Sequence, residues 1–285
     1  MRKLLLGAAA ISLSGCSFLG MGNGHSQYAY NPAPAYGSGY GGYGSTNAGC
    51  APIHAVLADG NCLSRLNFEG GIGISGNVGG GDVITGDQAT LGGAAIRNVD
   101  FKEAYKPGLR AEAGMSYALD PVTKITAMAF ADEADGDGVV NFGTIGGQAL
   151  TGQLSDYESK GIEVGVRRYF RPSPAPLVRS VRPYIEGRVG ASYQDAIVIQ
   201  NASLGGAAVA GGQVGLYDSG WVPAAAGLVG IETPVSPRAT VGIETGIRYT
   251  GKQDSTDLTG TAFNGINDGS DRWSMPLMLR TRYRF

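Results

Sequence analysis

The C-terminal segment Arg272–Phe285 decides the fold, and it reads RWSMPLMLRTRYRF. Every second residue from Trp273 to Phe285 is apolar, aromatic or threonine, whereas Arg280 and Arg282 lie at the positions between them. Side chains of a β-strand point alternately to two faces. The segment therefore predicts a strand with one continuous apolar face and aromatic residues near both of its ends.

Seven upstream segments repeat this alternation over about ten or more residues. The eight predicted strands are Leu63–Ser75, Pro107–Leu119, Val122–Ala131, Tyr157–Phe170, Val181–Tyr193, Trp221–Glu232, Arg238–Thr250 and Arg272–Phe285. Long and short connections alternate between them, which places both ends of the barrel segment beside the short turns. This pattern is typical of an up-and-down transmembrane β-barrel. The predicted fold is therefore all-β, an eight-stranded antiparallel barrel.

Composition excludes several other classes of protein. Glycine occupies 48 of the 285 positions, and each glycine costs a helix interior about 1 kcal/mol, so a helical bundle is not expected. Beyond the N-terminus, no stretch offers the ~20 consecutive apolar residues of a membrane-spanning helix. With 22 Lys+Arg against 24 Asp+Glu, no positive excess indicates a nucleic-acid partner.

The other face of the predicted strands combines glycines with charged residues. A solvent-exposed exterior would carry many lysines, but only Lys124 and Lys160 fall within the strands. We therefore expect a lumen charge network formed by Glu69, Arg110, Glu112, Glu163, Arg167, Glu186, Arg188, Glu244, Arg248 and Arg280. The interior of eight strands is just wide enough for side chains, and buried charges are stable only when paired. A salt-bridged plug is the favoured interpretation, and a charged conductance path is the alternative.

The N-terminus indicates export. Arg2 and Lys3 precede the apolar run Leu4–Leu13, as in a secretory signal peptide. The tetrapeptide that ends at Cys16, Leu-Ser-Gly-Cys, resembles the lipobox of bacterial lipoproteins, in which this cysteine becomes the lipidated first residue. Ser17 after it, in place of Asp, implies sorting to the outer membrane. The resemblance therefore implies a signal peptide over residues 1–15 and a palmitate-bearing lipid anchor at Cys16.

Residues 16–49 are expected to form a flexible tether, because this Gly-, Tyr- and Pro-rich segment has neither strand nor helix periodicity. With Cys16 set aside, Cys50 and Cys62 are predicted to close a disulfide loop over residues 50–62 in the oxidising periplasm. A zinc site with His54 is the weaker alternative, because two cysteines and one histidine leave the metal shell incomplete. The barrel is predicted over residues 63–285.

Tyr283 and Phe285 close the last predicted strand. A C-terminal aromatic residue resembles the signal by which bacterial outer-membrane proteins are recognised by the barrel insertion machinery. Together with the eight strands, residues 63–285 resemble the small OmpA-type outer-membrane barrel family. That resemblance implies a Gram-negative outer membrane, with its lipid and lipopolysaccharide, as the setting. The chain departs from the family in its lipoprotein N-terminus and in stopping at Phe285 without a peptidoglycan-binding domain.

No catalytic residues, metal site or cofactor are predicted. The two histidines, His25 and His54, both precede the predicted barrel, whereas barrel enzymes such as lipid A deacylases and omptin proteases place a histidine at the outer barrel edge. Acidic residues crowd the long connections, including Asp132, Glu133, Asp135 and Asp137. A carboxylate dyad there is conceivable, but a solvated acidic loop is favoured. Such loops are expected to attract divalent cations, and the arginines of the short-turn end suit phospholipid headgroups.

The glycine runs Gly79–Gly81 and Gly205–Gly206 lack the strand–turn–helix context of a phosphate-binding loop, so they are expected to lie in mobile surface loops. The favoured function is a structural or surface-interaction barrel lipoprotein with a plugged lumen and long acidic loops. A small-solute pore is one alternative, and a soluble periplasmic carrier barrel held by its lipid is another. The sequence does not identify a surface partner.

Overall fold

The computed structural model describes residues 54–56, 62–86, 94–171, 180–209, 213–259, 264–267 and 271–284. These residues form antiparallel strands and one short helix, α2 (Phe101–Ala104). Asp100 caps this helix, because its carboxylate accepts a hydrogen bond from the backbone amide of Glu103. Within the described chain, no helix is long and apolar enough to span a membrane.

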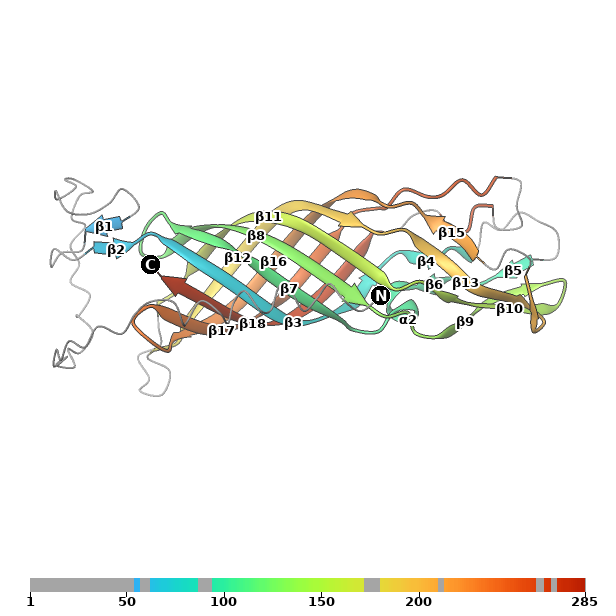
Figure 1. Ribbon diagram of the computed structural model, residues 1–285, viewed down its shortest axis with the longest axis horizontal. Coiled ribbons are helices and arrows are strands. Elements are labelled where there is room, and N and C mark those ends of the chain that lie inside the picture. Colours follow the sequence, from blue (N-terminus) through green and yellow to red (C-terminus); the bar gives the residue numbers. More distant parts are fainter. Residues whose placement is uncertain are drawn as a thin grey trace, which may run out of the picture. The chain divides into compact units, whose positions relative to one another are not determined.

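Eight long strands close into a barrel (Figure 1), in the order β11, β12, β16, β17, β18, β3, β7 and β8. Their bounds are β3 (Leu66–Gly80), β7 (Gly108–Ala118), β8 (Thr123–Ala134), β11 (Tyr157–Tyr169), β12 (Arg182–Gln194), β16 (Gly220–Pro234), β17 (Ala239–Thr250) and β18 (Arg272–Arg284). The last strand pairs with the first, β18 with β3, and so closes the wall without a free edge. The predicted eight-stranded all-β barrel is confirmed, and each strand overlaps its predicted segment.

The register brings glycine opposite large charged residues across the wall. Gly165 of β11 pairs with Arg188 of β12, and Gly190 of β12 pairs with Glu163 of β11. A Cβ atom at Gly165 would lie 2.7 Å from the Arg188 Cγ atom, so any larger residue would displace the arginine. Glycine thus provides the room that these side chains need inside a narrow barrel.

A second sheet continues beyond one end of the barrel, where the sequence predicted loops (Figure 1). Its strands are β5 (Ala94–Ile96), β9 (Val139–Ile145), β10 (Gln148–Leu154), β13 (Ile197–Leu204), β14 (Ala207–Ala208) and β15 (Gln213–Tyr217). A ribbon of β4 (Asp82–Ile84) and β6 (Val99–Asp100) lies in the same connections. We call the barrel end with the second sheet the sheet end, and the opposite end, with the short connections, the turn end.

The glycines that were expected in surface loops lie partly in a hairpin turn and partly in a strand. Gly205 and Gly206 form the two-residue turn between β13 and β14, with φ values of 58° and 87° that suit glycine. Gly79 and Gly80 belong to the end of β3. These glycines shape hairpins and a strand end.

The second sheet has an apolar core of its own. Val83, Phe142, Leu150, Ile199 and Leu216 are among its buried side chains. The Tyr217 hydroxyl donates a hydrogen bond of 2.9 Å to the Val83 carbonyl and so ties the sheet to the β4–β6 ribbon. The long connections therefore form a packed unit.

The segment before the barrel also contains strands. β1 (His54–Val56) pairs with β2 (Cys62–Ser64), so the predicted loop of residues 50–62 contains a β-hairpin, and the first barrel strand begins at Leu66 instead of Leu63. The predicted signal peptide, Cys16 and the tether lie outside the described residues. The predicted disulfide does too, because Cys50 and the side chain of Cys62 are not described.

Candidate functional site: the charged barrel interior

The outer surface of the barrel is apolar. Large aliphatic side chains cover it on every strand, such as Ile162, which is 64% exposed, Val189 and Leu277. Toward the sheet end, Tyr193 contacts Trp221 and Tyr249 contacts Trp273, with ring centroids 5.6 Å and 5.0 Å apart. Toward the turn end, the exposed aromatic side chains are Phe68, Phe170 and Tyr283. Two aromatic girdles that flank an apolar belt are characteristic of a barrel in a bilayer.

The height of this belt fits a membrane. Trp273 and Tyr283 lie on the same outward face of β18, ten residues apart in sequence. At ~3.3 Å per residue and a strand tilt of ~40°, their separation along the barrel axis is ~25 Å. An outer-membrane barrel has an apolar band of about this height. A soluble carrier barrel needs the opposite arrangement, with the apolar face inside, so that alternative does not fit.

The structure places all ten predicted lumen residues inside the barrel. Each is buried, with between 0% and 6% of its surface exposed. Four further charged residues, Lys124, Glu232, Arg272 and Arg282, are buried with them. The charged face that the sequence analysis assigned to the lumen is therefore the inner face.

Glu112 of β7 is the hub of the network. Its carboxylate pairs with four arginines, at 2.7 Å from Arg110 Nε, 2.9 Å from Arg188 Nη1 and 2.6 Å from Arg248 Nη2, and also with Arg280. These arginines come from four different strands, so one carboxylate connects opposite parts of the wall. Charge-assisted hydrogen bonds of this kind are about twice as strong as neutral ones.

A second cluster centres on Glu186 of β12. Its carboxylate lies 2.7 Å from Arg167 Nε and 2.6 Å from Arg188 Nε, and it accepts a hydrogen bond of 2.6 Å from the Thr126 hydroxyl. Arg167 also pairs with Glu69 at 2.8 Å. Because Arg188 contacts both Glu112 and Glu186, the two clusters form one continuous network.

The remaining predicted residues join the same network. Arg280 Nε lies 2.7 Å from Glu244, and the Tyr184 hydroxyl donates a hydrogen bond of 2.9 Å to that carboxylate. Arg248 pairs with Glu163 as well as with the hub. The ion pairs thus fill the cross-section of the lumen with side chains that are almost fully buried.

The expectation that Asp132 lies in an acidic loop is wrong. β8 continues to Ala134, beyond the predicted end at Ala131, so Asp132 points into the barrel and pairs with Arg110. Inward-facing aromatic residues were also missed, among them Phe130, whose ring lies 4.2 Å from the Arg110 guanidinium. The alternation along β8 indicates this orientation, because Phe130 and Lys124 are an even number of residues apart and therefore point to the same face.

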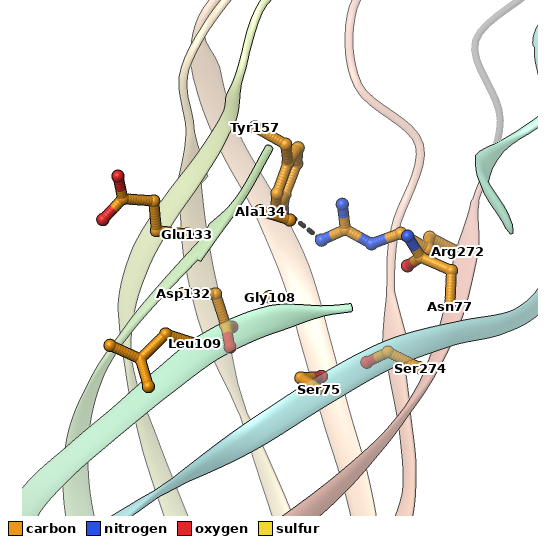
Figure 2. Close-up of a pocket in the computed structure, with 10 residues that line it drawn as sticks. All are labelled: Ser75, Asn77, Gly108, Leu109, Asp132, Glu133, Ala134, Tyr157, Arg272 and Ser274. Carbon is orange, nitrogen blue, oxygen red and sulfur yellow. Dashed lines mark hydrogen bonds between the residues drawn. The ribbon is translucent and has the colours of Figure 1, made fainter. Parts of the chain in front are cut away.

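A small recess opens at the sheet end of the network (Figure 2), lined by Asp132, Tyr157 and Arg272, among others. Arg272 crosses it, donates a hydrogen bond to the Tyr157 hydroxyl and lies 3.8 Å from the centre of the Tyr157 ring. The Arg272 guanidinium also lies 5.5 Å from the centre of the Phe101 ring. Helix α2 and β11 thus cover the outer end of the lumen with stacked aromatic and cationic groups.

The acidic residues of the long connections do not gather into a cation site in the part of the chain that is described. No group of three or more His, Cys, Asp or Glu side chains able to hold a metal occurs there. Several of these acids have other partners: Glu103 accepts a hydrogen bond of 3.0 Å from Arg97, and Asp137 lies 3.6 Å from Lys106. The hydrogen bond from Arg97 lowers the pKa of the Glu103 carboxyl below its usual range.

No family model matches the chain, and no curated protein does. Among solved structures, the chain is similar to Neisserial surface protein A (NspA), at 11% identity and a TM-score of 0.43 over 78% of this chain and 99% of that one. It is also similar to outer membrane protein OprG from Pseudomonas aeruginosa, at 15% identity and a TM-score of 0.42, covering 77% and 95% of the two chains. It is similar to outer membrane protein AlkL at 16% identity and a TM-score of 0.39, covering 86% of this chain and 95% of that one.

Proposed function

We propose that this protein is an outer-membrane β-barrel with a plugged lumen, which holds its second sheet at the cell surface for interaction instead of passing solutes. The network centred on Glu112 carries this proposal. A conducting lumen needs hydrated charges, whereas four arginines here saturate one carboxylate that is fully buried. The apolar belt between two aromatic girdles supports a position in a bilayer, with lipid and lipopolysaccharide around it.

The orientation follows from the connections. In outer-membrane barrels the short turns face the periplasm and the long connections face outward. The second sheet would then lie outside the cell, and its apolar core would hold it in a defined shape for contact with a surface partner. We propose a non-enzymatic role, because the buried carboxylates are engaged by arginines and not free for acid–base chemistry.

The lipid anchor at Cys16 and assembly by the barrel insertion machinery through Tyr283 and Phe285 complete the proposal. The lipobox-like sequence supports the anchor, and the outward position of Tyr283 at the turn end of β18 supports the assembly signal. Mass spectrometry of the mature N-terminus tests the anchor. A free Cys16 thiol would contradict it.

Labelling of intact cells tests the display of the second sheet. A cysteine introduced at Gln148, which is exposed in the β9–β10 hairpin, should react with a membrane-impermeant maleimide in intact cells. A cysteine at Ser236, exposed in the β16–β17 turn, should react only after lysis. The unsubstituted chain measures the background from the natural cysteines. Reversed labelling would contradict the proposed orientation, and no labelling of Gln148→Cys in intact cells would contradict surface display.

A further inference from the structure

The turn end of the lumen carries a group of cations that the central network does not neutralise. Lys124 of β8, Arg182 of β12, and Arg282 and Arg284 of β18 are all at inward-facing positions of their strands. Lys124 is 7% exposed and Arg282 is 6% exposed, whereas Arg182 and Arg284 are half-buried. The four cations thus line the mouth through which the barrel opens at the turn end.

The side chain of Tyr169 lies at the centre of this group. Its ring centroid is 4.6 Å from the Arg182 guanidinium, 5.4 Å from the Lys124 ammonium and 5.6 Å from the Arg282 guanidinium. The Tyr169 hydroxyl donates a hydrogen bond of 3.2 Å to Glu232. Three cations from three strands therefore surround one ring, and their charges converge on a small volume.

Two carboxylates, Glu232 and Glu69, face these four cations, and Glu69 is already paired with Arg167. Glu232 pairs with Arg282, and Arg182 donates a hydrogen bond of 3.3 Å to the Pro121 carbonyl. Among the described residues, no carboxylate forms an ion pair with Lys124, Arg182 or Arg284. A buried ammonium without a counter-ion is strongly unfavourable. Cationic side chains therefore outnumber carboxylates at the mouth, and this excess favours an anion there.

Arg182 and Arg284 are only half-buried, so an anion can reach their guanidinium groups from the turn end of the barrel. Guanidinium groups donate paired hydrogen bonds to the oxygens of a phosphate, and a lysine adds a compact charge. Convergence of cations from several sides suits a multiply charged, tetrahedral anion better than a planar carboxylate.

We infer that the turn-end mouth of the lumen binds a phosphate group, held by Lys124, Arg182 and Arg284. A soluble phosphate from the aqueous side and the headgroup of a membrane lipid present the same chemistry. Arg168 provides a control for non-specific attraction of phosphate to this rim. It lies at the turn end of β11 but points outward, where its guanidinium lies 3.5 Å from the Thr123 hydroxyl.

Binding of inorganic phosphate to the full-length protein in maltoside micelles, which contain no phosphate, tests this inference. Equilibrium dialysis should show saturable binding at one site that weakens with added salt. Lys124→Gln and Arg284→Gln should each weaken it about tenfold, and Arg168→Gln should leave it unchanged. Without phosphate, Lys124→Gln should unfold at the same or a higher urea concentration than the wild type, since it removes an unpaired buried charge. Phosphate should raise the urea midpoint of the wild type by more than that of this variant.

Repeating the dialysis in micelles that contain phosphatidylglycerol identifies whether the phosphate group comes from a lipid headgroup or from solution. Competition between the lipid and phosphate, lost in Lys124→Gln, would identify a lipid headgroup as the occupant, and an absence of competition would identify a soluble phosphate. Either result supports the site. Two results would overturn it: the absence of saturable phosphate binding, or equal weakening by Arg168→Gln and Lys124→Gln.

Discussion

Replacing Glu112 by glutamine should destabilise the whole barrel. The substitution keeps the shape of the side chain, removes its charge, and turns an amide NH₂ group toward arginine donors. In the wild type, the Glu112 carboxylate accepts hydrogen bonds from Arg110, Arg188, Arg248 and Arg280. The single remaining carbonyl oxygen of glutamine accepts about two of them, because it has two lone pairs.

The size of the effect follows from these contacts. Loss of about two hydrogen bonds to charged groups, at roughly 1.5–3 kcal/mol each, costs about 3–6 kcal/mol. This range agrees with the 3–5 kcal/mol that is typical when one partner of a buried ion pair is removed. For a guanidinium m-value of roughly 4 kcal/mol/M, the unfolding midpoint should fall by about 1 M.

The fluorescence of Trp221 and Trp273, which both face outward, reports unfolding in a guanidinium titration of the protein in lipid or detergent. Glu158→Gln is the matched control, because Glu158 lies on barrel strand β11 with an exposed side chain, and its midpoint should move by less than about 0.2 M. An unchanged midpoint for Glu112→Gln, together with a shift of ion selectivity toward anions, would refute the plug and indicate a hydrated lumen.

Three further predictions concern other parts of the molecule. Deleting Phe285 should lower the amount of heat-modifiable barrel in the outer membrane but leave export intact, and unchanged amounts on gels of unboiled membranes would contradict the assembly signal. Phe142→Ala should destabilise the second sheet by about 3–5 kcal/mol, because Phe142 is 2% exposed in its core, and proteolysis there should accelerate while the barrel stays heat-modifiable. Partial burial opposes ionisation of Asp120, but the backbone amides of Val122 and Thr123 donate hydrogen bonds of 2.8 Å and 2.7 Å that lower the pKa of this carboxyl. The stabilising effect of ionised Asp120 should therefore be complete above pH ~5 and disappear as the pH falls through the lowered pKa. An Asp120→Asn variant should have a lower urea midpoint than the wild type at neutral pH, and a difference that did not shrink in acid would contradict this prediction.

The barrel could be predicted from the sequence because its wall separates two environments. Outward residues such as Ile162 and Val164 form the apolar belt, and the inward Glu163 between them contacts arginine, so the period of two is strong along every strand. The same parity assigned the ten charged residues to the lumen. It did not assign their partners. Arg167 and Glu69 are 98 residues apart in sequence, and the closure and stagger of the barrel strands bring them together.

The second sheet was missed for a physical reason. Strands β9 and β10, with seven residues each, also alternate, as the buried Val140 and Phe142 show. A strand of seven residues is too short to cross a ~25 Å belt, so the pattern of spanning strands predicts loops at these segments. Asp132 was misplaced for a related reason, because β8 continues past the membrane belt toward the sheet.

Single-channel recording in planar lipid bilayers tests the central claim most directly, because it asks whether the lumen is closed. With the network intact, the purified full-length protein should give no reproducible conductance steps, even though a gel shift on boiling shows that the inserted barrel is folded. Stable steps of uniform size from the wild-type protein would contradict the plug and establish a pore.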